Sequence, residues 1–257
     1  MDFTARMLAL LEQMRRERNG AVADAMRFYG APYGLNYGVS LPTLRQIALS
    51  EQPDPDFARY LFLQEVRELR LAALYLIPPS TLIPADFTFL AAGIVNSEIA
   101  EEAAFALLSR AEVLPELFRT WTVSANPLLQ YAALLAAART PLAAIDWADT
   151  AAALVHRNAA AAERTAERTA GSAAESVSES APETVHKSAP EPITGSASDP
   201  LPPYAAHLTA LGAVALLAAL ASRNEESRRA VLRAVGSLGK LPAEDFVHEE
   251  LAWRLEV

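Results

Sequence analysis

The chain has 257 residues, 52% of them hydrophobic and 21% charged, which is enough apolar material for a substantial core and excludes a wholly disordered chain. It contains no cysteine, so disulfides, thiolate metal sites and a cysteine nucleophile are excluded. Lysine and arginine number 22 against 31 acidic residues, and the net charge of −9 argues against a generally basic nucleic-acid-binding protein.

Apolar residues recur at spacings of three and four along most of the chain, which predicts helices almost everywhere and no strand. In the first part of the chain we expect helices at Phe3–Arg18, Ala21–Tyr29, Leu41–Ser50, Pro55–Phe62, Gln64–Ile77, Pro84–Gly93, Ser97–Arg110, Leu114–Val123, Leu128–Arg139 and Leu142–His156. In the last part we expect helices at Pro203–Ser222, Glu225–Leu238 and Pro242–Leu255. The predicted N-caps are Ser40, Asp54, Asn96, Asn126 and Asn224.

Between these two parts the composition changes to Ala, Ser, Thr, Glu and Pro, with few large apolar residues. Such a composition buries too little surface to offset the entropy of ordering. We therefore interpret residues 157–203 as a low-complexity linker insertion within one repeat domain, which is formed by residues 1–156 and 204–257. The first residues of the insertion can continue the preceding helix to about Gly171 before the Ser/Pro tract ends it.

Neither a signal sequence nor a membrane helix is expected. Residues Met1–Arg18 mix charges into an amphipathic pattern, and no stretch reaches the roughly 20 unbroken apolar residues of a membrane span. The most apolar run, Leu208–Ala221, has the composition of a buried helix. We expect a cytoplasmic protein without a membrane partner.

An internal repeat is the most informative feature of the sequence. A pair of small residues recurs at Ala72, Ala103 and Ala132, in steps of 31 and 29 residues, and a weaker copy lies at Ala230. Helix pairs recurring at this period predict a HEAT-type solenoid, a curved α-α superhelix with an inner groove. Two residues before each pair lies a row of side chains that we expect along this groove, namely Arg70, Glu101, Gln130 and Arg228.

Four ordered segments resemble motifs of the AlkD-like DNA alkylation-repair glycosylases, a family of HEAT-like repeat proteins. Gly38–Arg45 resembles the family's entry motif, and Glu65–Ala72 resembles its Glu-x-Arg-x-x-Ala stretch. Trp121–Asn126 resembles its Trp-x-x-Ser-x-Asn turn, and Arg228–Ala230 resembles its last Arg-Lys-Ala helix. The resemblance covers most of the chain outside the insertion.

The resemblance implies excision of positively charged N-alkylated purines without flipping the base into a pocket. In the family a carboxylate stabilises the oxocarbenium-like sugar, while aromatic side chains contact the cationic nucleotide. Glu101 retains a carboxylate at this position and is the candidate catalytic residue. Ser97 stands where the family has tryptophan, the family's arginine falls at Gln130 or Tyr131, and its second tryptophan falls near Arg233.

The resemblance also implies a DNA-binding surface despite the acidic net charge. The candidate DNA-binding residues are Arg67, Arg70, Gln130, Tyr131, Arg228, Arg229 and Arg233. Arg139 can extend such a basic strip, although charges of this kind also occur on solvated helix faces. The aromatic segment Phe28–Gly38 could stack on bases or pack against the first repeat, and Trp121 and Trp147 are expected in the core.

No metal or cofactor is expected. The four histidines have no metal-ligand spacing, and no P-loop, dinucleotide-binding fingerprint or nucleophile elbow occurs. Three hypotheses for function follow. The first is an AlkD-like protein that binds double-stranded or branched DNA with weak or no base excision. The second is a scaffold that binds a protein or peptide in its groove, and the third is an active alkylpurine glycosylase that uses Glu101. We favour the first.

Overall fold

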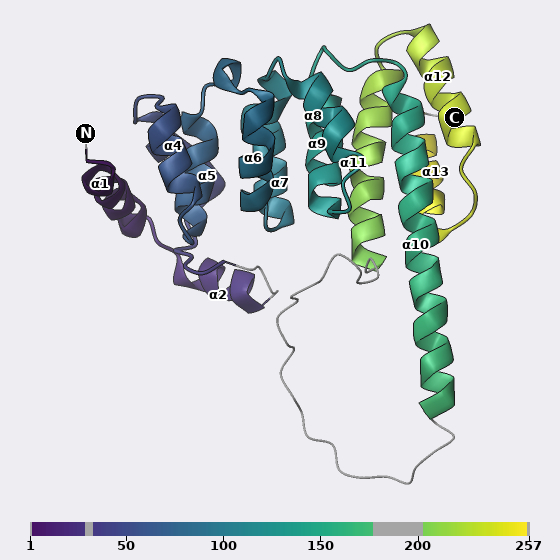
Figure 1. Ribbon diagram of the computed structural model, residues 1–257, viewed down its shortest axis with the longest axis horizontal. Helices are drawn as coiled ribbons and strands as arrows, with labels where there is room; N and C mark the ends of the chain where they lie inside the picture. Colours follow the sequence, from purple (N-terminus) through teal and green to yellow (C-terminus); the bar gives the residue numbers. More distant parts are fainter. Residues whose placement is uncertain (1, 29–32, 177–202, 256–257) are drawn as a thin grey trace.

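The computed structural model describes residues 2–28, 33–176 and 203–255, and within these ranges the protein is built from α-helices. The helices stand side by side from α1 at one end of the molecule to α12 and α13 at the other, in chain order except that α11 lies between α9 and α10 (Figure 1). The first nine are α1 (Phe3–Arg16), α2 (Gly20–Phe28), α3 (Leu41–Leu49), α4 (Pro55–Phe62), α5 (Arg67–Leu76), α6 (Phe87–Gly93), α7 (Ser97–Glu102), α8 (Leu114–Trp121) and α9 (Pro127–Arg139). The others are α10 (Trp147–Ser176), α11 (Pro203–Ala221), α12 (Glu225–Gly236) and α13 (Pro242–Leu255). The all-helical prediction is confirmed for the described residues, where extended pairing is limited to one bridge between Leu35 and Val66.

Local sequence fixes where many of these helices begin. Each of the five predicted N-caps accepts a backbone N–H from the first turn of its helix. The pairs are Ser40 with Thr43, Asp54 with Asp56 and Phe57, Asn96 with Ile99, Asn126 with Leu128, and Asn224 with Ser227. These bonds satisfy donors that have no partner inside the helix, and the predicted caps are confirmed.

The core is a row of five helical segments in which each contacts the next: α3, α5, α7 with its continuation, α9 and α11. The repeated alanines Ala72, Ala103 and Ala132 are at most 1% exposed. Small side chains at these positions let neighbouring helices approach closely, so three copies of the repeat behave as predicted. The prediction of a fourth copy at Ala230 is wrong. Ala230 lies in α12, which packs on α10 and α11, and the place beside α9 belongs to α11.

The helix predicted at Ser97–Arg110 changes geometry along its length. After α7 the chain passes through a π-helical turn, η3 (Ala103–Leu107), and then a 3₁₀ turn, η4 (Leu108–Arg110). Two further 3₁₀ turns, η1 (Pro79–Thr81) and η2 (Pro84–Asp86), connect α5 to α6. A π turn accommodates one extra residue, and such turns often occur at functional sites.

Helix α10 runs well beyond the predicted end at His156. It continues through Ser176, as Figure 1 shows, so the predicted continuation to about Gly171 is confirmed and exceeded. Asn158 and Ala159 are buried in the core, and a boundary at residue 157 therefore cuts a core helix. The segment 177–202, which holds the rest of the predicted insertion, lies outside the described residues.

Among the described residues, one helix is long and apolar enough to cross a membrane by length and composition alone. It covers Tyr204–Ala221 in α11, with a mean hydropathy of 1.8, and 67% of this window is buried within the fold. The helix packs against α9, α10, α12 and α13. This packing agrees with the expected buried helix at Leu208–Ala221.

Candidate functional site

Three glutamates of α7 each accept a hydrogen bond from a tyrosine of a different part of the chain. Glu98 accepts from Tyr33 in the segment before α3, and Glu102 accepts from Tyr75 in α5. Glu101 accepts from Tyr131 in α9, with 2.9 Å between Tyr131 Oη and Glu101 Oε1. We call Glu98, Glu101 and Glu102 the acidic row. The tyrosines fix the orientation of all three carboxylates.

The protonation of these groups follows from burial and from their mutual repulsion. Burial raises the pKa of Glu101, and the neighbouring charges of Glu102 and Glu98 raise it further, against the hydrogen bond from Tyr131. Burial and the adjacent carboxylates also raise the pKa values of Tyr33, Tyr75 and Tyr131. The tyrosines therefore remain protonated donors, and Glu101 holds its proton more readily than a solvated glutamate does.

Arg67 lies beneath the acidic row, where it is 1% exposed. Its Nε donates to Glu98 at 2.8 Å, and its Nη1 donates to Glu68 at 3.0 Å and to the carbonyl of Val39 at 2.9 Å. Glu68 in turn accepts the backbone N–H groups of Tyr37 and Val39. The carboxylates hold the pKa of Arg67 above its ordinary value despite burial, which lowers it. Arg67 therefore ties the segment before α3 to α5 and α7, and the prediction that it contacts DNA directly does not fit this burial.

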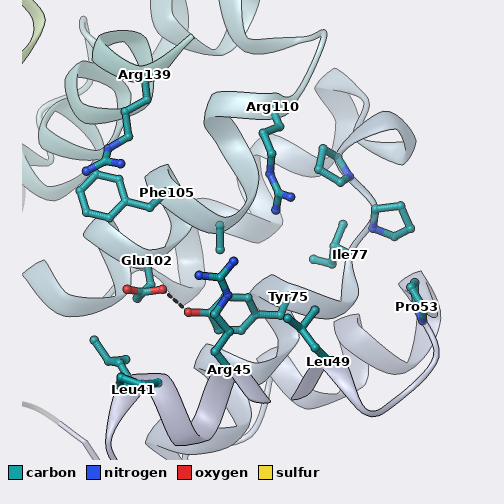
Figure 2. A pocket seen from close by; sticks show the side chains of 14 residues that line it. Leu41, Arg45, Leu49, Pro53, Tyr75, Ile77, Glu102, Phe105, Arg110 and Arg139 are labelled. Carbon is teal, nitrogen blue, oxygen red and sulfur yellow. Dashed lines mark hydrogen bonds between the residues drawn. The ribbon is translucent and has the colours of Figure 1, made fainter. Parts of the chain in front are cut away.

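Beside the acidic row lies a pocket of about 940 Å³, shown in Figure 2. Six elements contribute its charged and aromatic residues: α3 gives Arg45, α5 gives Tyr75, α7 gives Glu102, η3 gives Phe105, η4 gives Arg110, and α9 gives Arg139. The rest of the wall is largely apolar and comprises Leu41, Pro42, Leu49, Pro53, Ile77, Pro78, Pro79 and Ala106. We call this the arginine pocket.

The three arginines of this pocket are exposed, and none has a hydrogen bond or ion pair with another described residue. Figure 2 shows Arg45 and Arg110 reaching into the pocket from opposite walls. The guanidinium of Arg139 lies 3.8 Å from the centre of the Phe105 ring, and that of Arg45 lies 5.9 Å from the centre of the Tyr75 ring. Two of these three arginines therefore lie over aromatic rings, and the chemistry of the three guanidinium groups suits an anion.

The predicted groove row does not form one surface. Gln130 is 1% exposed, and its side chain bonds to Asn158, Thr209 and the carbonyl of Ser124 within the core. Its burial is explained by the position of α9, which is enclosed by α7, α8, α11, η3 and η4. Arg228 lies in α12 and donates to the carbonyl of Leu255, away from α7. The prediction that Gln130 and Arg228 lie along a common groove is therefore wrong.

The remaining predicted residues are dispersed. Arg70 is half-buried and donates to the carbonyl of Gln64 at 2.8 Å. Tyr131 is buried apart from its bond to Glu101. Arg229 pairs with Glu225 on the exposed side of α12, and Arg233 lies on the same helix. The structure thus brings together Glu101 and Tyr131, and separately Arg228, Arg229 and Arg233.

The aromatic residues are mostly structural. Trp121 and Trp147 are buried as predicted, and the Trp147 ring stacks on Phe118 with 4.0 Å between ring centres. In the segment before α3, Tyr33 bonds to Glu98 and Tyr37 accepts from Arg15 at 3.0 Å. These contacts favour packing of this segment over base stacking, whereas Tyr29 lies outside the described residues.

Sequence reasoning missed Arg45 and Arg110. Arg45 is the last residue of the Gly38–Arg45 motif, so its position in that motif was a usable signal. Arg110 follows the π turn, and no periodicity rule places it on the face that carries Glu102. Among the described residues, no group of three or more histidine, aspartate or glutamate side chains is arranged to hold a metal ion.

No protein-family model and no curated protein matches the sequence. One similar solved structure is described as a new family of proteins related to the HEAT-like repeat DNA glycosylases with affinity for branched DNA structures. The TM-score is 0.56 at 13% sequence identity, and the match covers 98% of this chain and 95% of that chain. The protein therefore has an all-α, HEAT-like helical-repeat fold.

Proposed function

We propose that this chain is a DNA-binding HEAT-like repeat protein, related to the alkylpurine glycosylases but with weak or no base-excision activity. The observation that carries the proposal is the arginine pocket. Arg45, Arg110 and Arg139 converge there without acidic partners among the described residues, in a chain whose net charge is −9. Exposed arginines without ion pairs are free to bind an anion, and the planar guanidinium group matches phosphate through paired hydrogen bonds.

Two further findings support this proposal. The motifs at Gly38–Arg45 and Glu65–Ala72 resemble those of DNA glycosylases, and a similar solved structure is described as belonging to a family with affinity for branched DNA structures. Arg67 and Glu68, from the second motif, and Val39, from the first, bond to one another. These bonds join the segment before α3, the helix that carries Arg45, to α5, the helix that carries Tyr75.

Base excision is poorly supported by the surroundings of Glu101. Its carboxylate is half-buried, bonded to Tyr131 and flanked by Glu98 and Glu102, which raise its pKa. A carboxylate that stabilises a cationic sugar acts through its negative charge, and these neighbours oppose ionisation. Ser97 supplies no aromatic ring at the start of α7. We therefore infer binding without efficient excision.

A salt titration tests DNA binding. Fluorescence anisotropy with labelled duplex and four-way-junction DNA is expected to show binding that weakens steeply with salt. Replacing Arg45, Arg110 and Arg139 together by alanine should weaken binding and flatten the salt slope. The matched control is Arg119→Ala, which removes an equally exposed arginine of α8 outside the pocket. Absence of binding by the wild-type protein at low salt would overturn the proposal and favour the protein-binding scaffold.

Excision is tested separately with duplex DNA that contains N-methylated purines. We expect the wild-type protein and Glu101→Gln to release the same background amount of base. Release by the wild type that Glu101→Gln abolishes would instead establish Glu101 as the catalytic carboxylate. The same anisotropy assay, applied to Glu101→Gln, shows whether this variant still binds the DNA.

A further inference from the structure

The arginine pocket has dimensions that suit a small ligand. Its volume of about 940 Å³ lies in the range of sites for single small molecules. Prolines border it, with Pro53 at its edge in Figure 2 and Pro78 and Pro79 also in the wall. Duplex DNA presents its phosphates on a continuous convex surface, which can contact the exposed arginines but cannot fill the pocket. A single unpaired nucleotide is small enough to enter it.

The wall of the pocket divides into an ionic part and an apolar part. Arg45, Arg110 and Arg139 provide guanidinium groups, which bind phosphate oxygens through charge-assisted hydrogen bonds. The aliphatic side chains of the wall, and the guanidinium planes that lie over Tyr75 and Phe105, provide surfaces against which a base can pack. Both halves of a nucleotide, the phosphate and the base, therefore find matching chemistry within one pocket.

The acidic row restricts how a DNA strand can reach this pocket. Glu98, Glu101 and Glu102 lie on α7, immediately before the turn that carries Phe105. A phosphodiester backbone that crossed α7 would be repelled by these carboxylates. A strand that ends in the pocket meets only Glu102 of this row, and its terminal phosphate offers the three arginines more negative charge than an internal diester does.

We propose that the arginine pocket binds an unpaired nucleotide at the end of a DNA strand, with its terminal phosphate held by Arg45, Arg110 and Arg139. The inference rests on the proposed DNA binding and adds to it a preference for a phosphorylated strand end. The same chemistry is present in a free deoxynucleoside monophosphate, so the experiment distinguishes these two sources.

The test compares one duplex in several forms by fluorescence anisotropy at fixed salt. The forms are blunt-ended DNA and DNA with a single-nucleotide 5′ or 3′ overhang, with and without the terminal phosphate. For the wild-type protein we expect the phosphate on at least one overhang to tighten binding about tenfold. Arg110→Ala should lose this gain, whereas Arg119→Ala on α8 should retain it. A deoxynucleoside monophosphate should compete more strongly with the phosphorylated overhang than with the blunt duplex.

The outcomes separate this inference from the proposed function. Equal wild-type affinity for phosphorylated and unphosphorylated ends, or a gain that survives in Arg110→Ala, overturns the strand-end site, while binding of the blunt duplex still supports DNA binding. Binding of the free monophosphate that depends on Arg110, without binding of any DNA, overturns both the strand-end assignment and the proposed function. Circular dichroism melting of each variant confirms that these exposed substitutions leave the fold intact.

Discussion

Asn158 of α10 donates a hydrogen bond to the side-chain carbonyl of Gln130 in α9, with 2.6 Å between Nδ2 and Oε1. The same Nδ2 lies 3.0 Å from Oγ1 of Thr209 in α11, and Thr209 also lies 3.3 Å from Gln130 Oε1. All three side chains are at most 2% exposed. This buried network joins the first residues of the predicted insertion to both parts of the repeat domain.

Gln130→Ala should lower the free energy of unfolding by about 2 to 4 kcal/mol. The substitution removes the acceptor of Asn158 and leaves a cavity between three helices. Urea unfolding monitored by circular dichroism measures the change. The control is Gln46→Ala, an exposed glutamine of α3, which should cost less than about 0.5 kcal/mol. Equal losses in the two variants would contradict the importance of the network.

Arg67→Met should destabilise the protein by about 3 to 5 kcal/mol, because it leaves the fully buried Glu68 without its cationic partner. Arg27→Ala breaks an exposed ion pair with Asp24 and should cost less than about 1 kcal/mol. Denaturant unfolding of the two variants measures both changes in stability. A loss in Arg67→Met as small as that in Arg27→Ala would mean that the ion pairs of Arg67 contribute little to stability.

Two glycines should respond oppositely to alanine. A Cβ at Gly93, the last residue of α6, would lie 2.0 Å from Cε1 of the buried Phe62. Gly93→Ala should therefore destabilise the protein by about 1 to 3 kcal/mol. A Cβ at Gly236 in α12 has no neighbour within 4 Å, and Gly236→Ala should gain up to about 1 kcal/mol. Thermal melts of both variants test the contrast, which fails if both change the melting temperature in the same direction.

Glu101→Gln should stabilise the protein at pH 7 and have no effect near pH 4. Burial and the acidic row raise the folded-state pKa of Glu101 above its unfolded value of 4.5. The folded state therefore binds this proton more tightly, and stability is lost as the pH rises through the folded-state pKa. The gain at pH 7 should be less than about 1 kcal/mol, because solvent screens this half-buried group.

Unfolding in urea at the two pH values measures this difference. Glutamine keeps an oxygen that can accept from Tyr131, so the comparison isolates the charge. The control is Glu112→Gln, an exposed glutamate outside the acidic row. A pH-independent effect of Glu101→Gln, or an equal gain in the control, would show that the acidic row imposes no electrostatic cost.

The elements that sequence reasoning predicted correctly are those set by local chemistry. Asn96 and Asn224 cap their helices because a short polar side chain satisfies the first-turn donors wherever the rest of the chain lies. The boundaries of α4 and α13 agree with prediction for the same reason, since a proline opens each helix. The alanine repeat predicted the stacked core because close helix packing requires small side chains.

The errors arose where the outcome depends on distant parts of the chain. Helix α9 is apolar or small around most of its circumference, so its pattern cannot reveal that Gln130 faces α10 and α11. Arginine is usually exposed, so its residue type predicts a surface position for Arg67. It is buried because the segment before α3 folds over it, where the carbonyl of Val39 accepts from its guanidinium. Helix α11 follows a long insertion and takes the place beside α9, so α12 packs on α10 and α11 instead. The spacing of apolar residues does not predict this arrangement.

The π turn η3 decides which residues share the arginine pocket. Glu102 and Arg110 are eight positions apart, which in a regular α-helix places them about 80° apart around the axis. The π turn η3 and the 3₁₀ turn η4 that follows it both change this angle, and both side chains line the pocket. A homologue that lacked a single residue between Ala103 and Leu107 would keep its helical stack but turn Arg110 away from Arg45. Among such homologues, the length of this turn would separate chains that have the pocket from chains that do not.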